Sequence, residues 1–488
     1  MMYKSIFIVV ISILLAGCSP SVPKVNKVMD ELPSIYPDYV GVTVPSNIAP
    51  LRFKVSGEVE DAIASLALGD YEWVEKADEG SFLFSESQWR SLMNKASGDS
   101  ISVTIYEKTA GEWSAYRPFY IHVSELTIDN YLAYRLIPPG YEQWHQMGLY
   151  QRDLTSYTEE VIVDNRQTDF NCVNCHSFRM HHPDDMVFHM RSSFGGTYVW
   201  SDGKLEKLDG KVSADIASLV YPYWHPSGDY VAFSTNKTNQ MFHMKDKNRI
   251  EVFDAASDVL VYDVKNHRVI TDSLLFSKQA FETFPSFSPD GKTLYFSSSV
   301  AQKMPNNYKK VKYSLCSISF DASTGKFGDK VDTLFSAPAT DKTAVFPRVS
   351  SDGNLLAFTM ADYGNFAIWH KEADLCLIDL RTGETKSLDV VNSPEAESYH
   401  SWSNNGRWLV FVSRRDDGLY SRPYIAFIDK DGTAHKPFVV PQADPEYYLN
   451  SLKSYNVPEF IAEPVTLERR DIIKMAQEGV PVKVTVRQ

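Results

Sequence analysis

The chain has 488 residues, of which 43% are hydrophobic and 23% are charged, and this composition is typical of a folded protein rather than a disordered one. Its 49 Lys and Arg against 62 Asp and Glu give a net charge of −13, which argues against a nucleic-acid-binding surface built on basic charge. Five cysteines are too few for a disulfide-stapled scaffold of this length. Aromatic residues make up 13% of the chain, which favours strands over helices and a mainly β fold.

The first eighteen residues predict export. Lys4 precedes an apolar run over residues 6–15, which is too short to span a membrane but fits a signal-peptide core. The run ends in Leu15-Ala16-Gly17-Cys18, which resembles a bacterial lipobox. That resemblance implies cleavage after residue 17, acylation of the Cys18 thiol, and an outer-membrane lipoprotein facing the periplasm. An ordinary signal peptide with a chance cysteine is the alternative.

Residues 18–35 are polar with scattered prolines, which is typical of a tether. Strand-like alternation follows at residues 51–55, 101–106 and 119–123, and one helix is predicted at residues 86–96. We therefore expect a β-sandwich-like domain over residues 36–150. It carries no recognisable chemical motif.

The region over residues 196–445 contains a repeat. Each copy is a strand, a tight turn ending in Gly, and a second strand ending in Phe, as is typical of hairpins. The copies lie at residues 221–234, 284–297, 346–358 and 399–411. They resemble the PD40 (WD40-like) repeats of the periplasmic protein TolB, and this resemblance implies a β-propeller. The spacing between copies predicts five to seven blades.

The remaining segments are predicted from local signals. Residues 446–488 should form a helix over residues 467–478 and a short strand over 482–486 that pack against the body. Cys316 and Cys376 fall on equivalent strands of neighbouring blades, too far apart to be bridged, so both should be buried and unpaired.

One motif in the connector over residues 151–195 carries chemistry. Cys172-Val173-Asn174-Cys175-His176 matches Cys-x-x-Cys-His, the attachment signature of c-type cytochromes. In that chemistry Cys172 and Cys175 form thioethers to haem c, and His176 is the proximal iron ligand. No second Cys-x-x-Cys is present, so at most one haem is expected.

The distal iron ligand must reach around a ring roughly 10 Å across, which requires about ten residues or more of extended chain. His189, thirteen residues beyond His176, satisfies this condition, and Met147 is the alternative from upstream.

Three other interpretations of the motif stay open. Zinc could be held by the two cysteines with two of His181, His182 and His189. A disulfide between Cys172 and Cys175, or a merely structural cluster, would also account for the residues.

These features together predict a periplasm-facing, lipid-anchored propeller with one haem c, acting in electron transfer or redox sensing. The arrangement resembles haem-motif PD40 lipoproteins of the Bacteroidetes type. The alternative is a propeller scaffold that docks an envelope protein and holds zinc or a structural Cys/His site. No Gly-x-Ser-x-Gly elbow and no His-Glu-x-x-His helix occurs, so an enzyme of the hydrolase type is disfavoured. Partners are expected to be the membrane, through the anchor, and a redox or envelope protein, with no nucleic acid.

Overall fold

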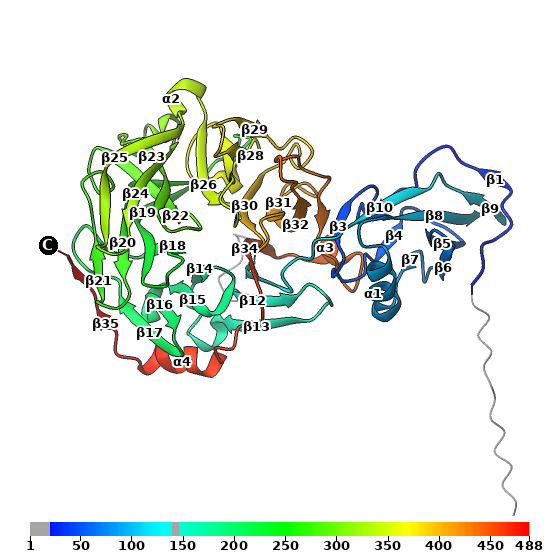
Figure 1. Cartoon of the computed structure of the whole chain (residues 1–488), viewed down its shortest axis with the longest axis horizontal. Helices are drawn as coiled ribbons and strands as arrows, with labels where there is room; N and C mark the ends of the chain where they lie inside the picture. Colours follow the sequence, from blue (N-terminus) through cyan, green and yellow to red (C-terminus); the bar gives the residue numbers. More distant parts are fainter. Residues whose placement is uncertain (1–19, 139–145, 488) are drawn as a thin grey trace, which may run out of the picture.

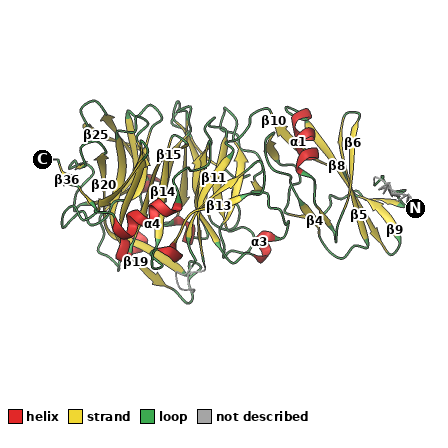
Figure 2. Cartoon of the chain, turned by 90° about the horizontal axis from the view of Figure 1, so that it is seen from below, coloured by secondary structure: helices red, strands yellow, loops and turns green. Residues whose placement is uncertain are grey.

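The computed structural model describes residues 20–138 and 146–487, so Cys18 lies outside the described residues. The chain forms an N-terminal β domain beside a large β-propeller (Figure 1). Figure 2 shows the two parts side by side, with the propeller blades standing next to one another. In the part of the chain that the structure describes, no helix is both long and apolar enough to cross a bilayer.

The N-terminal domain consists of two sheets and one helix. The larger sheet contains β1 (Lys27–Val28), β3 (Thr43–Pro45), β5 (Asp61–Leu68), β6 (Tyr71–Lys76), β8 (Ser100–Thr109), β9 (Glu112–Ala115) and β10 (Phe119–Ser124). The smaller sheet contains β2 (Ile35–Tyr36), β4 (Phe53–Val55) and β7 (Ser81–Phe82). Burial alternates along β8, as expected for a sheet with one face against the core. Helix α1 (Glu86–Lys95) buries Trp89, Leu92 and Met93, which confirms the predicted helix.

The propeller has six four-stranded blades within the described residues, inside the predicted range of five to seven. In order from the channel outward, blade 1 is β34 (Ser454–Ile461), β11 (Tyr131–Ile137), β12 (Gly148–Asp153) and β13 (Glu159–Asp164). Blade 2 is β14 (Val173–Arg179), β15 (His182–Met190), β16 (Gly196–Ser201) and β17 (Lys204–Asp209). Blade 3 is β18 (Val220–Trp224), β19 (Tyr230–Phe242), β20 (Ile250–Asp263) and β21 (Arg268–Ile270).

The other three blades follow the same plan. Blade 4 is β22 (Ala280–Phe287), β23 (Thr293–Val300), β24 (Ser314–Asp321) and β25 (Lys326–Phe335), and helix α2 (Ala337–Thr340) follows it. Blade 5 is β26 (Thr343–Val349), β27 (Leu355–Ala361), β28 (Asp374–Asp379) and β29 (Thr385–Ser387). Blade 6 is β30 (Glu397–Trp402), β31 (Trp408–Ser413), β32 (Arg422–Phe427) and β33 (Phe438–Val439), and α3 (Tyr447–Asn450) follows it. Each inner strand packs beside the next and β14 contacts β34, so the ring closes around a central channel.

The strand pairing places the domain boundaries differently from the sequence interpretation. Strand β11 and the first half of β12 lie within the predicted sandwich-like domain of residues 36–150, yet both strands belong to blade 1. The connector predicted over residues 151–195 supplies β13 and half of blade 2. The C-terminal region adds more than packing, because β34 is the inner strand of blade 1 and pairs with β11. The pairing of β34 with β11 joins segments more than 300 residues apart, which no local pattern reveals.

The last segments brace the outer rim of the propeller. Helix α4 (Arg469–Glu478) confirms the predicted helix, apart from two residues at its start. The predicted strand over residues 482–486 is divided into β35 (Val482–Lys483), which pairs with β17, and β36 (Thr485–Val486), which pairs with β21. The chain end therefore joins the outer edges of blades 2 and 3.

The N-terminal domain is attached to blade 6 and the segment after it. Tyr39 donates a hydrogen bond to the Val439 carbonyl (3.4 Å), and Lys54 forms an ion pair with Glu446 (2.7 Å). A single hydrophobic core runs through this contact, from the N-terminal sheets into blades 1, 5 and 6.

Candidate functional site

A backbone irregularity repeats on all six inner strands and shapes the channel. One residue of each has a left-handed φ between 47° and 58°, and the six residues are Cys175, Tyr221, Phe284, Phe346, Tyr399 and Val457. At the same point the pairing of each inner strand with its neighbour shifts register. A positive φ is uncommon for bulky residues, so six equivalent instances mark a constant feature of this fold.

Two cavities occupy the channel and share part of its wall. The smaller, about 70 Å³, is lined by the ends of the inner strands and the turns that follow them. The larger, about 270 Å³, is lined by residues nearer the beginnings of these strands. His176, Pro222, Arg348, His400 and Val457 line both cavities. The sequence motif therefore reaches the centre of the propeller.

The Cys-x-x-Cys-His motif runs into β14. Cys172 lies immediately before this strand and Cys175 lies on it, and both thiols are buried and free, so no disulfide joins them. Cys175 lines the larger cavity. Burial raises the pKa of the Cys175 thiol, partly offset by the positive charge of Arg191, and the Cys172 thiol is close enough to contribute to the shift.

His176 is held in a form suited to ligation. Burial, with a smaller effect of Arg135, lowers its pKa to about 3, so the imidazole is neutral at pH 7. The ring bonds to the backbone of Val457, whereas Nε2 is buried with no hydrogen-bond partner. A neutral imidazole with one nitrogen held by a carbonyl and the other unpaired is the arrangement that metal-binding histidines use.

The donor set fits a covalently attached haem. Two buried, free thiols three residues apart and an adjacent histidine with an unpartnered Nε2 are the groups that such attachment requires. The same residues also belong to the propeller repeat. Cys175-His176-Ser177-Phe178 occupies the positions of Tyr399-His400-Ser401-Trp402 in blade 6, and Pro stands in place of His in the other four blades.

His400 is the cavity histidine that the sequence analysis did not identify. It is buried, and its pKa is lowered to about 3 by burial and then by Arg348, whereas the backbone of Ala357 and Phe346 acts in the opposite direction. Aligning residues 175–178 with 399–402 would have revealed it. The same alignment shows that His176 occupies a position of the blade repeat, whereas Cys172 lies outside the repeated segment.

The two predicted distal ligands lie elsewhere. His189 is buried on β15, and its Nδ1 is 3.1 Å from the Thr197 hydroxyl. Met147 is buried immediately before β12. Neither residue lines either cavity.

The histidines proposed for zinc are also dispersed. His182 is exposed at the start of β15, and His181 Nδ1 lies 3.0 Å from the Phe460 carbonyl at the mouth of the smaller cavity. Among residues 20–138 and 146–487, no group of three or more His, Cys, Asp or Glu side chains is close enough to hold a metal ion.

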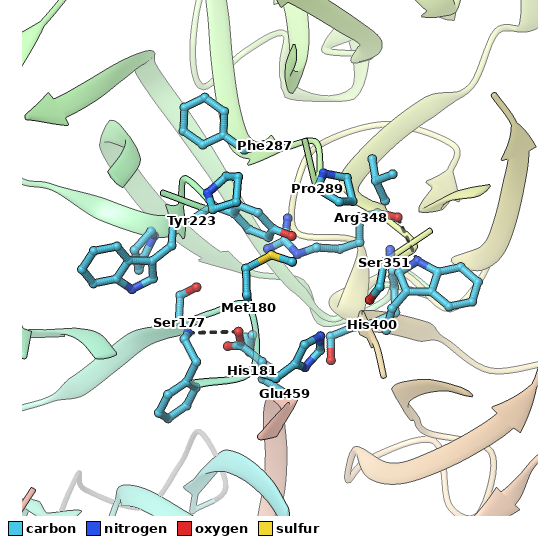
Figure 3. A pocket seen from close by; sticks show the side chains of 18 of the residues that line it. Ser177, Met180, His181, Tyr223, Phe287, Pro289, Arg348, Ser351, His400 and Glu459 are labelled. Carbon is cyan, nitrogen blue, oxygen red and sulfur yellow. Dashed lines mark hydrogen bonds between the residues drawn. The ribbon is translucent and has the colours of Figure 1, made fainter. Parts of the chain in front are cut away.

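The smaller cavity contains a buried carboxyl group (Figure 3). Glu459 accepts a hydrogen bond from the Phe178 amide (3.0 Å), and burial raises its pKa to about 8. Arg348 and Tyr223 lie across this cavity from Glu459 in Figure 3, and the Arg348 guanidinium is 4.9 Å from the centre of the Tyr223 ring. The positive charge of Arg348 opposes this rise in the pKa of Glu459, so the two groups interact electrostatically.

The other predicted thiols are structural. Cys316 on β24 and Cys376 on β28 are buried and unpaired, as predicted. Burial raises their pKa values to about 11 and about 12 respectively, so both are protonated and inert at neutral pH.

Comparison with known proteins identifies no family. No protein-family model matches the chain, and no curated protein matches it. Among solved structures, an oligogalacturonate lyase in complex with manganese is 12% identical. The match covers 64% of this chain and 74% of that chain at a TM-score of 0.35. A prolyl endopeptidase is 15% identical, and the match covers 64% of this chain and 42% of that chain at a TM-score of 0.34. The tricorn protease is 12% identical, and the match covers 80% of this chain and 39% of that chain at a TM-score of 0.32. The chain thus spans less than half the length of the last two.

Proposed function

We propose that this chain is an exported, lipid-anchored propeller that holds one c-type haem at its central channel and acts in electron transfer or redox sensing. The observation that carries the proposal is the combination at the start of β14 of two buried thiols and a neutral histidine with an unpartnered Nε2. A bound haem would supply one-electron chemistry. Anchoring through Cys18 to the outer membrane would place the propeller in the periplasm, as the lipobox implies.

The chain contributes attachment and surroundings in this proposal. Cys172 and Cys175 would hold the group covalently, and Val457 fixes the His176 ring so that Nε2 is free to bind iron. Aromatic side chains of the larger cavity, among them Phe284, Phe346 and Tyr399, would exclude water from it. The polarity of the surroundings is one of the means by which proteins set a redox potential.

The test is a pyridine haemochrome assay beside a zinc determination, on protein expressed with cytochrome c maturation factors. We expect about one haem per chain in the wild type, none in a Cys172→Ala, Cys175→Ala double variant, and an unchanged amount in Cys376→Ala. The last variant removes a buried thiol from a different blade. Wild-type protein without covalent haem, from cells that load a known cytochrome c in parallel, overturns the proposal.

The distal ligand needs a separate measurement. The predicted ligands are His189 and Met147, whereas His400 is the second histidine on the channel wall. Low-spin haem spectra of His189→Ala, Met147→Leu and His400→Ala variants identify the residue whose loss converts the iron to high spin. Unchanged spectra for His189→Ala and Met147→Leu rule out both predictions.

The second candidate function is a propeller scaffold or binding module, and the composition of the larger cavity favours it. Four arginines line that cavity, and none of them forms an ion pair with another described residue, which is typical of a ligand site. In this case ligand or partner binding survives the loss of both motif cysteines.

A further inference from the structure

The larger cavity is rich in positively charged side chains. Its lining includes four arginines from different blades: Arg135 on β11, Arg191 after β15, Arg348 on β26 and Arg414 after β31. No Asp or Glu is among the described residues that line it. This contrasts with the chain as a whole, whose net charge is −13. We name this space the arginine cavity.

The arginines are not neutralised by the protein itself. None of the ion pairs formed by the described residues involves these four side chains. The Nε atoms of Arg135 and Arg414 are buried and lack hydrogen-bond partners. Burial lowers the pKa of Arg414 to about 10, although Tyr399, Asp417 and Glu395 nearby oppose this shift. Arg135, Arg348 and Arg414 are half-buried and Arg191 is exposed. Charge that is partly removed from water without an ion pair costs folding free energy, which favours a role for these arginines in binding an anion.

The remaining walls of the arginine cavity are largely aromatic. They comprise Tyr221, Phe284, Phe346, Phe366, Trp369 and Tyr399. The Arg414 guanidinium lies 4.3 Å from the centre of the Trp369 ring, which holds it in place without neutralising it. Apolar walls around a few convergent charged donors are typical of small-molecule sites.

We propose that the arginine cavity binds a compact ligand that carries two or more carboxylate groups on an apolar or ring-shaped body. Guanidinium groups bind carboxylates through paired hydrogen bonds, and the aromatic walls bind the body of the ligand. The volume of about 270 Å³ limits a fully enclosed ligand to a small molecule. The carboxylates could belong to a free metabolite or to the propionate groups of an attached haem. The proposal does not depend on haem attachment.

The probe is benzene-1,3,5-tricarboxylate, which combines a ring with three carboxylates, and benzene-1,3,5-tricarboxamide is its neutral control. Isothermal titration calorimetry is performed on the haem-free Cys172→Ala, Cys175→Ala protein. We expect binding of the tricarboxylate alone, weakened by added NaCl. Arg414→Gln and Arg191→Gln should each reduce the affinity about tenfold or more. Arg470→Gln, an exposed arginine on α4, removes the same charge outside the cavity and should leave the affinity unchanged.

The haem-loaded protein distinguishes the two sources of carboxylate. Retained tricarboxylate binding in that protein indicates a free anion as the natural ligand, and lost binding indicates that haem carboxylates occupy the arginines. Absence of haem in the wild type would refute the proposed function and leave the calorimetry unaffected. The anion site is overturned if the haem-free protein does not bind the tricarboxylate, or if Arg414→Gln and Arg191→Gln bind it as tightly as Arg470→Gln does.

Discussion

Glu282 should make the propeller less stable as the pH rises. Its side chain is buried on β22, where Oε1 accepts a bond from Ser298 (3.3 Å) and Oε2 has no partner. Burial, reinforced by the nearby Asp258, raises its pKa from 4.5 to about 8. The folded state therefore keeps a proton that the unfolded chain releases above pH 4.5. The contribution of Glu282 to the free energy of unfolding is fully present below pH 4.5 and is lost between pH 4.5 and about 8.

The two pKa values set the size of the effect. A gap between 4.5 and about 8 corresponds to about 5 kcal/mol of unfolding free energy once the pH exceeds both. Glu282→Gln removes the titration and preserves the shape of the side chain. The free energy of unfolding of the variant should exceed that of the wild type by about 1 kcal/mol at pH 5, about 3 kcal/mol at pH 7 and about 5 kcal/mol at pH 9, in addition to a difference that does not depend on pH.

Urea denaturation at these three pH values, followed by tryptophan fluorescence, measures the difference in the free energy of unfolding between the two proteins. Groups common to both cancel in the difference. Glu384→Gln, which removes an exposed carboxylate, should follow the wild-type curve at every pH. A gap between Glu282→Gln and wild type that stays constant from pH 5 to 9 would refute the reasoning.

Two further predictions concern the turns and the closure of the ring. Gly291 and Gly353 both have a left-handed φ (73° and 76°), so alanine at either position should cost about 1–2 kcal/mol of unfolding free energy. At Gly291 the added Cβ would also lie 2.3 Å from His225 Nε2, which should cost about 1–3 kcal/mol more. At Gly353 no atom apart from those of its chain neighbours lies within 4 Å of the added Cβ, so no such further cost is expected. Equal urea midpoints for the two alanine variants would contradict this difference. Tyr455, on the ring-closing strand β34, is 1% exposed, so Tyr455→Ala should cost about 3–5 kcal/mol by thermal or urea unfolding. The Tyr455 hydroxyl accepts one long hydrogen bond, from Gln442 Nε2 (3.5 Å), so Tyr455→Phe should leave the free energy of unfolding nearly unchanged. Similar losses for both variants would show that the hydroxyl, and not burial of the aromatic side chain, stabilises β34.

The propeller itself was predictable because its signals are local. Asp290-Gly291 and Asp352-Gly353 specify tight turns through the positive φ of glycine, and the strands on either side alternate visibly. The N-terminal helix and α4 were found for the same reason. Blade 1 escaped prediction because β34 and β11 meet only through the closure of the ring.

The sequence by itself determined that the chain is a mainly β protein with a propeller repeat and one Cys-x-x-Cys-His motif, since each of these depends on residues that are neighbours in the chain. Only the tertiary structure decided that Cys175 and His176 stand on the inner strand of a blade, equivalent to Tyr399 and His400. It also decided that Arg135 and Arg414, separated by most of the propeller sequence, share one cavity whose described lining residues include no carboxylate. The physical reason is that a propeller converts distance along the chain into proximity at its axis, where every inner strand contributes to the same wall.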